Sequence, residues 1–228
     1  MVGGYPIIAI GASRSAPIRP AAQLISAALA FTAGKRYTSS MDTIIQAIEG
    51  RRARRALAGN SVPKDALDRI LTAATFAPSC MNKQPWRFLV ADDPAALEKA
   101  RAALSDGNYW ARKAPVLIAA LTKPELDCRL NDRREYALFD LGLAVANLLA
   151  QATAEGLIAH PMAGFNPLAL KSAFGIDDSH IIPVMIAVAW PGDAAGLNDK
   201  HRESETGARD RAAFDSVVQR NRWETAAE

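Results

Sequence analysis

Residues 132–155 form the longest apolar segment of the chain with helical periodicity, DRREYALFDLGLAVANLLAQATAE. The second half of this segment is apolar on nearly every side, which predicts a helix that runs through the interior of the fold. Gly156 follows it, and glycine commonly ends a helix. The rest of the chain is therefore expected to pack around this helix.

Short apolar runs rich in branched residues predict the strands. They are WRFLVAD (86–92), APVLIAALT (114–122), LIAHPM (157–162) and IIPVMIAVAW (181–190). The last run is almost continuously apolar, which is typical of a strand that is buried on both faces. Amphipathic segments that alternate with these runs predict further helices.

Capping residues and prolines predict where those helices begin and end. Asp42 is expected to cap a helix in which Ile44, Ile45 and Ile48 form one apolar stripe, with its end near Gly50. In the next helix Ser61 is the expected cap, Pro63 lies in the first turn and Pro78 stops it. Residues 93–104 and 166–175 predict two more helices.

Composition narrows the class of protein. With 228 residues, half of them apolar, the chain can bury a substantial core as one globular unit. The net charge is +3, but basic residues are mixed with acidic ones, so nucleic-acid binding is not expected. No apolar run reaches the roughly 20 residues of a membrane span, so no membrane contact is expected.

The cysteines and histidines give no sign of a metal site or a disulfide framework. Cys80 and Cys128 lie far apart without a CxxC motif, and His160 and His180 have no companions at ligand spacing. We therefore expect neither a disulfide nor a bound metal, and a reducing cytoplasm as the compartment. No GxSxG motif indicates a nucleophilic serine, and we predict no catalytic side chain.

The two ends of the chain differ in composition from its middle. Residues 1–40 contain no acidic residue and include the apolar run LISAALAFTA, so they could be a targeting leader or a dispensable extension, and we expect the latter. Residues 196–228 are too polar to fold alone and are expected to lie across another surface. Residues 41–195 would form the globular domain.

Two groups of arginines could bind an anion. EGRRARRAL (49–57) places four guanidiniums close together, and forked donors of this kind suit phosphate or an anionic ring edge. Near the end of the chain Arg209 and Arg211 would project from one side of an extended segment and could clamp a phosphate. Each group could equally be a solvated basic surface.

Two loops carry backbone groups that could contact a polar heterocycle. In APSCMNKQPWRF (77–88), Pro78 ends a helix and leaves N–H groups unpaired, while Ser79 and Asn82 add side-chain donors and acceptors. In HPMAGF (160–165), small residues after a strand would let a planar ligand approach the backbone. Each loop could also be a structural connection only.

Taken in order, these motifs resemble the flavin-dependent nitroreductase family. The resemblance rests on RRARR, APSCMNKQPW, GNYWARKAPVLI, the long central helix, HPMAGF and RDR…FDSVV, and it spans about residues 42–222. It implies an α+β three-layer sandwich with a mixed central sheet flanked by helices. It also implies an intertwined homodimer with two FMN molecules at the subunit interface and a C-terminal arm that crosses onto the partner.

The resemblance also implies which residues bind FMN. Arg51, Arg52 and Arg55 would hold the phosphate and the pyrimidine edge, with Arg209 and Arg211 completing the phosphate site and Lys200 and Arg202 as a rival pair. The remaining expected contacts are Pro78, Ser79, Cys80 and Asn82 from the other subunit, Asn108 at the pyrimidine side, and Met162, Ala163 and Gly164 near N5 and the dimethylbenzene side. Ala53 stands where the family usually has a serine, so one hydroxyl contact is missing.

The implied activity is that of an FMN-dependent oxidoreductase. NADH or NADPH would reduce the flavin, and a small nitroaromatic, quinone or other electron-poor molecule would then take two electrons in a ping-pong cycle. Alternatives on the same scaffold are enone reduction and reductive dehalogenation, which residues 121–136 at the entrance would decide. A flavin-binding protein without turnover is the alternative from another class.

Overall fold

The computed structural model describes residues 44–132 and 134–223. These residues belong to a single compact unit that begins at Ile44. The predicted extension (1–40) and the predicted cap Asp42 lie outside the described residues, so both stay predictions.

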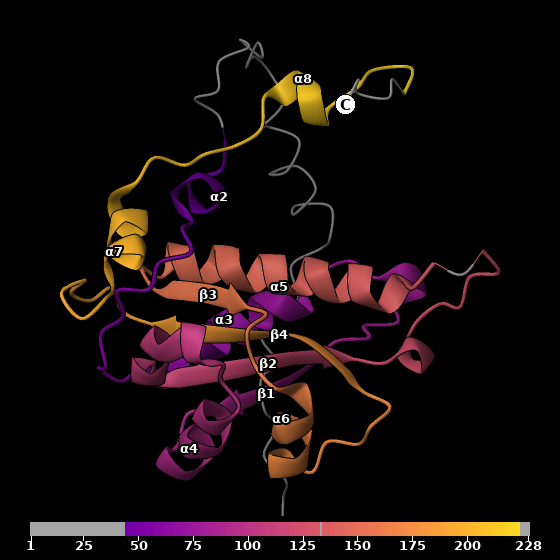
Figure 1. Ribbon diagram of the computed structural model, residues 1–228. Coiled ribbons are helices and arrows are strands. Elements are labelled where there is room, and N and C mark those ends of the chain that lie inside the picture. The colour runs from indigo at the N-terminus through magenta and orange to yellow at the C-terminus, as the bar shows by residue number, and fades with distance from the viewer. Residues whose placement is uncertain (1–43, 133, 224–228) are drawn as a thin grey trace, which may run out of the picture. The chain divides into compact units, whose positions relative to one another are not determined.

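A four-stranded sheet forms the centre of the fold, with the order β1-β2-β4-β3 (Figure 1). Its strands are β1 (Arg87–Ala91), β2 (Val116–Thr122), β3 (Ile158–Met162) and β4 (Ile181–Ala189). All four predicted strands are therefore confirmed, each within two or three residues of the expected bounds. In the middle of the sheet Ile118 of β2 lies between Val90 of β1 and Ile186 of β4.

Every strand pairing among the described residues is antiparallel, so the mixed pairing implied by the resemblance is not found there. The connections explain this. The segments that contain α4 and α6 each return the chain to the end of the sheet at which the preceding strand ended, so the next strand runs in the opposite direction. The predicted α+β sandwich is confirmed: helices lie on both faces of the sheet (Figure 1).

The helices are as follows, with η for a 3₁₀ helix. They are α2 (Gln46–Gly50), α3 (Lys64–Thr75), η2 (Cys80–Asn82), α4 (Pro94–Ala102), η3 (Asp106–Lys113), η4 (Pro124–Leu126), α5 (Tyr136–Ala154), α6 (Pro167–Phe174), α7 (Asp199–Thr206) and α8 (Phe214–Val217). Helices α3 and α5 cover one face of the sheet, and α4 and α6 cover the other.

Strand β2 shows why the sequence forms two cores. All seven of its residues are buried, and successive side chains point to opposite faces of a strand. Ile118 and its even-numbered neighbours pack with α3 and α5, whereas Leu117 and its odd-numbered neighbours pack with α4 and α6. Burial of each such branched side chain contributes roughly 1.5–3 kcal/mol. The continuous apolar run thus fits a central strand.

The boundaries of three helices differ from the prediction. Helix α2 begins at Gln46, so Ile44 and Ile45 precede it and only Ile48 of the predicted stripe lies in the helix. Ser61 does not cap α3, because the helix begins after Pro63 without a side-chain cap, and the Ser61 carbonyl instead accepts from Trp190 Nε1 at 3.2 Å. Helix α5 begins at Tyr136, later than expected from the periodicity. Before it, Arg134 Nε donates to Asp132 Oδ2 at 2.7 Å, and this local pairing holds a turn in place of a first helical turn.

Among the described helices, α5 alone has the length and apolar composition that would also suit a membrane span. It packs against α3, β2 and β3, and its buried residues include Leu141 and Leu148. The packing accounts for its composition, because a helix in contact with a sheet and with other helices must be apolar around most of its circumference.

Candidate functional site

The predicted phosphate-binding arginines come together from the two ends of the described chain. Arg209 Nη2 donates to the carbonyl oxygens of Glu49 and, at 2.7 Å, of Arg51. Burial lowers the pKa of the Arg51 guanidinium, and the nearby positive charges of Arg209, Arg211 and Arg52 lower it further. Four guanidiniums therefore lie close enough to repel one another, an arrangement that an anion would stabilise.

The rival pair in α7 has other contacts. Arg202 donates to the Leu197 carbonyl at 3.0 Å and pairs with Asp199 at 3.1 Å, and Lys200 is exposed. Arg202 is thus paired within its own helix, whereas Arg209 lies against Arg51. The geometry favours Arg209 and Arg211 as the partners of the N-terminal arginines.

Glu205 of α7 fixes the backbone beside these arginines. Its Oε1 accepts from the Arg55 backbone N–H at 2.5 Å, and its Oε2 lies 3.9 Å from Arg54 Nη1. The Glu205 side chain is only 5% exposed. The sequence analysis missed Glu205, because a single glutamate in a polar helix has no pattern that distinguishes it from its exposed neighbours.

Arg55 lies over the ring of Trp110, which in turn packs on His160. The Arg55 guanidinium is 5.8 Å from the Trp110 ring centre, and the Trp110 and His160 ring centres are 4.4 Å apart. His160 Nδ1 is 2.9 Å from the Arg54 carbonyl, which can only accept, so Nδ1 carries the proton. Burial, together with the charges of nearby arginines, lowers the pKa of His160 to about 4. This stack orients Arg55.

Asn108 and Gly164, both predicted to contact the flavin, contact each other. Asn108 Nδ2 donates to the Gly164 carbonyl at 2.8 Å, and the Ser105 N–H donates to the same oxygen at 3.0 Å. A Cβ atom on Gly164 would lie 2.7 Å from Asn108 Nδ2. A side chain at position 164 would therefore displace the Asn108 amide, and glycine permits this close approach. It also means that one amide hydrogen of Asn108 is already engaged within the chain.

The other two residues of that turn differ in exposure. The Met162 side chain is buried in the core with α4 and α6, so its side chain faces away from the surface and only its backbone could face a ligand. Ala163 is exposed. Met162 is the last residue of β3, whereas Ala163 follows the strand.

The loop from Pro78 to Gln84 has an uncommon backbone. Met81, Asn82 and Gln84 all have positive φ angles, of 48°, 56° and 50°, which non-glycine residues rarely adopt. Ser79 Oγ accepts from the Gln84 N–H at 2.9 Å, and Asp140 Oδ2 of α5 accepts from the Cys80 N–H at 2.7 Å. Backbone conformations of this kind cluster at binding sites, where surrounding contacts hold them.

Cys80 of this loop forms a disulfide with Cys128, so the expectation of unpaired cysteines is wrong. The two Cα atoms are 6.1 Å apart although the residues are 48 positions apart in the sequence. The segment after η4 folds back over the loop and brings the two side chains together. Neither a short motif nor a regular spacing encodes this contact, which is why the sequence did not reveal it.

The loop and the arginines lie at opposite ends of α5. Cys80 bonds to Asp140 near the start of this helix, whereas Gly50, next to Arg51, lies against Thr153 near its end. Asp140 and Thr153 are 13 residues apart in α5, which at 1.5 Å per residue is about 20 Å. A single chain thus brings together Arg51, Arg52, Arg55, Arg209 and Arg211, but not the residues from Pro78 to Asn82.

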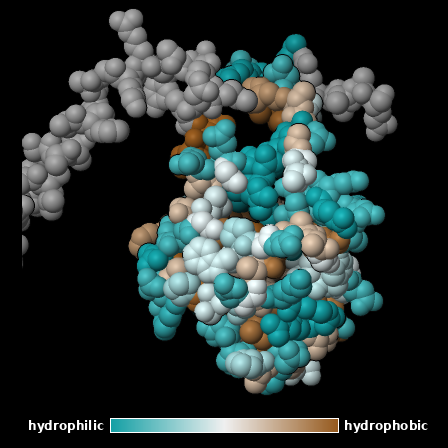
Figure 2. Space-filling view, turned by 90° about the vertical axis from the view of Figure 1, so that its left-hand side faces the viewer, coloured by the Kyte–Doolittle hydropathy of each residue, from teal (hydrophilic) through white to brown (hydrophobic). Residues whose placement is uncertain are grey.

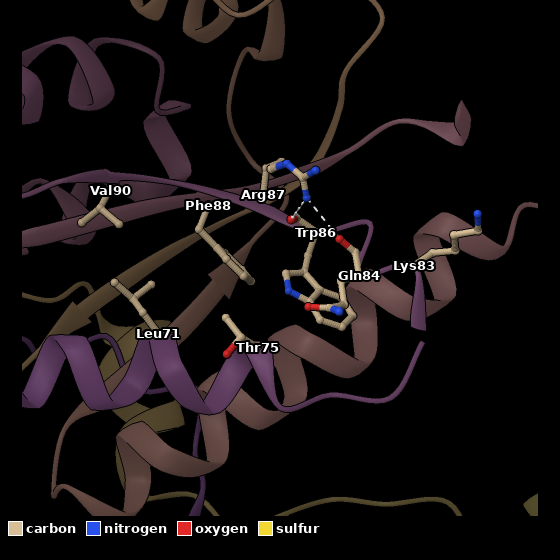
Figure 3. Close-up of a pocket in the computed structure, with 8 residues that line it drawn as sticks. All are labelled: Leu71, Thr75, Lys83, Gln84, Trp86, Arg87, Phe88 and Val90. Carbon is tan, nitrogen blue, oxygen red and sulfur yellow. Dashed lines mark hydrogen bonds between the residues drawn. The ribbon is translucent and has the colours of Figure 1, made fainter. Parts of the chain in front are cut away.

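A groove of about 590 Å³ lies between α3 and β1 (Figure 3). Its lining residues are Leu71, Thr75, Lys83, Gln84, Trp86, Arg87, Phe88 and Val90. Arg87 donates to the carbonyls of Gln84 and Trp86 and so fixes the entry into β1. None of the predicted cofactor-binding residues lines the groove, and it runs beside β1, an edge strand of the sheet.

Comparisons with known proteins agree with this arrangement. The protein named "Putative NAD(P)H nitroreductase YdgI" of Bacillus subtilis is 31% identical over 161 residues, 55% of this chain and 76% of its own. The iodotyrosine deiodinase of Haliscomenobacter hydrossis is 25% identical over 189 residues, 70% of this chain and 84% of its own. A solved oxidoreductase containing FMN superposes with a TM-score of 0.73 at 27% identity, covering 85% of this chain and 99% of its own.

The match to the family is wider than any single motif. Residues 48–109 and 105–190 fit the sequence profile of the Nitroreductase family, and this stretch includes the sheet, the helices on both of its faces and the first arginine group. The chain is therefore an oxidoreductase that belongs to the nitroreductase family.

Proposed function

We propose that this protein is an FMN-dependent oxidoreductase that uses NADH or NADPH to reduce small electron-poor molecules, such as nitroaromatics or quinones, by two electrons at a time. The observation that carries the proposal is the convergence of Arg51, Arg52, Arg209 and Arg211 from the two ends of the chain. Such a cluster suits a doubly charged phosphate at the end of a mononucleotide.

The residues present fit the phosphate of FMN. Arg51 already has a lowered pKa because of burial and like charges, and a phosphate dianion would reverse this unfavourable interaction. Hydrogen bonds between charged partners of this kind contribute roughly 1.5–3 kcal/mol each. Arg209 would serve twice, since it also bonds to the carbonyl oxygens of Glu49 and Arg51.

Other residues would position the ring. Arg55, held over Trp110, would place positive charge at the pyrimidine edge, where Asn108 also lies in our assignment. The backbone of Met162, Ala163 and Gly164 would approach the ring. Ala53 has no hydroxyl, so it would make no side-chain hydrogen bond to FMN. When bound, FMN supplies the hydride and electron chemistry, and the protein binds, orients and stabilises negative charge. We assign no side chain as a catalytic acid or base.

The assignment requires a homodimer. Pro78, Ser79, Cys80 and Asn82 lie about 20 Å from the arginines of their own chain along α5, so they would contact the flavin of a second copy. Apolar side chains that are exposed in the described chain support this. They are Ile44, Ile45 and Ile48 near α2, Leu138 and Phe139 on α5, and Phe214 and Val217 on α8. Figure 2 shows hydrophobic residues gathered toward the end where α2 and α8 lie.

The arm of residues 196–228 would then cross onto the partner. Apart from Leu197 and the side chain of Glu205, its described part is exposed or half-buried, which agrees with a segment that needs another surface. The groove beside the edge strand β1 offers apolar side chains and an unpaired strand edge of the kind that accepts an extended segment. A cytoplasmic location, where NADH and NADPH are available, stays part of the proposal.

A visible spectrum of the purified protein tests the proposal. A flavin spectrum that bleaches rapidly on anaerobic addition of NADH or NADPH, and recovers with a quinone or nitroaromatic acceptor, is the expected result. A bound flavin that neither nucleotide reduces would identify a flavin-binding protein without turnover. A colourless protein that does not take up added FMN would overturn the proposal.

A second candidate activity is reductive dehalogenation, favoured by the likeness to an iodotyrosine deiodinase. The same flavin site would serve, and residues 121–136 at the entrance would select a halogenated phenol in place of a nitroaromatic; enone reduction is a further option there. Release of halide from a halotyrosine by the dithionite-reduced protein, at a rate above that of nitroaromatic reduction, would favour this activity.

A further inference from the structure

We propose that Cys80 and Cys128 form a reversible redox site, in which the disulfide fastens the strained flavin-side loop (Ser79–Gln84) to the segment that follows η4. The loop conformation rests on few contacts from outside the loop. Asp140 accepts from the Cys80 N–H at 2.7 Å, and the disulfide joins the same residue to Cys128. Both of these ties act on Cys80, and they come from different segments of the chain. At the other end of the loop, Arg87 Nη1 donates to the Gln84 carbonyl at 3.1 Å.

The backbone of this loop has an unfavourable conformation that the disulfide would help to maintain. Positive φ angles at Met81, Asn82 and Gln84 are unfavourable for residues with a Cβ atom, and three in four positions add their costs. Met81 is 84% exposed, so burial of its side chain does not offset that cost. With fewer ties, the loop would sample other conformations more often.

The surroundings of the two sulfurs suit reversible chemistry. Cys80 and Cys128 are both half-buried, so a small thiol or a dithiol protein can reach the bond. A carboxylate oxygen of Asp127 and the two sulfur atoms all lie within 4.8 Å of one another. Asp127 is 7% exposed, its Oδ1 accepts from the Cys128 N–H at 2.7 Å, and its Oδ2 is buried without a hydrogen-bond partner.

The buried carboxyl offers a proton beside the sulfurs. Burial raises the pKa of Asp127, and Asp140 raises it further, both by its charge and as the acceptor of a side-chain hydrogen bond from the protonated carboxyl, whereas the Cys128 N–H and Lys83 act in the opposite direction. Protonation of Oδ2 would remove the buried negative charge and make this oxygen a hydrogen-bond donor. It could then pass this proton to a departing thiolate.

The reaction balances with an external dithiol as the reductant. One of its thiols loses its proton to solvent and attacks a sulfur of the pair, which forms a mixed disulfide, and the other cysteine leaves as a thiolate that takes a proton from Asp127. Asp127 then regains a proton from solvent. The second thiol of the reductant then displaces the remaining cysteine. Two electrons and two protons pass to the protein, which gains two thiols, and the reductant leaves with one disulfide.

The thiol state is tested first on the full-length protein. After equilibration in oxidised or reduced glutathione, alkylation with iodoacetamide and intact-mass measurement should show no adduct in the oxidised sample and two adducts on one chain in the reduced sample. Two adducts in every buffer, or a covalent dimer under oxidising conditions, would overturn the proposal. So would one bound zinc per chain whose removal by a chelator is needed before either cysteine reacts.

Amide hydrogen exchange then tests what the bond does. Peptides that cover residues 76–88 should exchange about tenfold faster after reduction, because a crosslink restricts local opening, whereas peptides from β2 should not change. A Cys128→Ser variant should exchange like the reduced protein in both buffers. Equal exchange of the loop in the two states of the natural protein would show that the disulfide does not hold it.

The effect on turnover rests on the proposed function. NADH or NADPH oxidation should differ at least severalfold between the two redox states of the natural protein and should be insensitive to oxidant in Cys128→Ser. If the protein binds no flavin, the proposed function fails, while the adduct count and the exchange rates still decide whether the redox site exists.

Discussion

Asn108 donates from Nδ2 to the carbonyl oxygen of Gly164 at 2.8 Å, which joins η3 to the turn after β3. Both ends of this bond were expected to contact a flavin. The bond means that the two positions cannot be changed independently, and it gives the first of the following predictions.

Replacement of Gly164 by alanine should destabilise the fold by about 1 kcal/mol, the value of one hydrogen bond. The new Cβ would lie 2.7 Å from Asn108 Nδ2 and would push this amide away from the carbonyl to which it donates. Chemical denaturation measures this change, and retained flavin measures its effect on the site. Asn108→Ala alone should cost a similar amount, but the double variant should cost clearly less than the sum of the two. Additive costs would show that the methyl group introduced at position 164 does not contact Asn108.

Arg209→Ala and Arg211→Ala should both weaken flavin retention, by roughly 1.5–3 kcal/mol for each lost charge-assisted contact. Only Arg209→Ala should also lower the stability of the protein without flavin, because Arg209 alone of the pair bonds to the carbonyls of Glu49 and Arg51. Flavin titration and thermal unfolding of both forms separate these effects. Arg134→Ala, a change of an exposed arginine paired locally with Asp132, is the matched control. Undiminished flavin content in a variant that carries both Arg209→Ala and Arg211→Ala would contradict our assignment of the phosphate site.

Glu205→Ala should loosen α7 from the arginine segment. The change removes the acceptor of the Arg55 N–H and leaves that group without its partner, at a cost of about 1–3 kcal/mol. The contact with Arg54 at 3.9 Å should add little, because the Arg54 side chain is 45% exposed. Hydrogen exchange of residues 199–206 is the measurement. Glu205→Gln, which keeps an acceptor oxygen, should exchange more slowly than the alanine variant, and equal rates would contradict the role of this bond.

His160 should make stability depend on pH below neutrality. Its pKa is lowered to about 4 in the folded protein from an ordinary value of 6.5, so the unfolded chain binds the proton more readily between these values. Stability is therefore unaffected above about pH 6.5 and falls as the pH decreases toward 4, by at most about 3 kcal/mol. Denaturant midpoints measured from pH 7.5 to 4.5 follow this loss. His160→Phe should flatten the slope in this range, and an unchanged slope would assign the loss to other groups.

Removal of residues 1–40 should leave a folded dimer that retains flavin. The match to the nitroreductase family begins at residue 48, and the compact unit begins at Ile44. Size-exclusion chromatography with detection at flavin wavelengths compares the truncated and full-length proteins. Loss of flavin from the truncated protein would show that the extension contributes to the site.

Local patterns predicted most of the fold. The apolar runs of all four strands were readable because each strand encodes its own environment. The cap of α3 was not, because the Ser61 carbonyl bonds instead to Trp190, which is distant in the sequence. The Cys80–Cys128 bond and the contact of Glu205 with Arg55 were missed for the same reason, since both depend on how separate segments meet.

The site was predictable in part. Guanidinium clusters are visible in a sequence, and the structure brings Arg51 and Arg209 together as the resemblance implied. Whether a residue contacts a ligand with its side chain or its backbone depends on tertiary packing, and the burial of Met162 shows this. His160 was not expected to bind a metal, and in the structure it packs on Trp110, over which Arg55 lies, so it helps to orient the guanidinium.

The separation of the two halves of the site along α5 has a genetic consequence. In the homodimer that we propose, a variant that lacks Arg209 and Arg211 and another that lacks Asn82 would each be inactive when expressed alone. Coexpressed, the two polypeptides would assemble into mixed pairs in which one centre receives both lesions and the other receives none. Each inactive allele would thereby rescue the other, an outcome that is impossible for a centre built within one polypeptide.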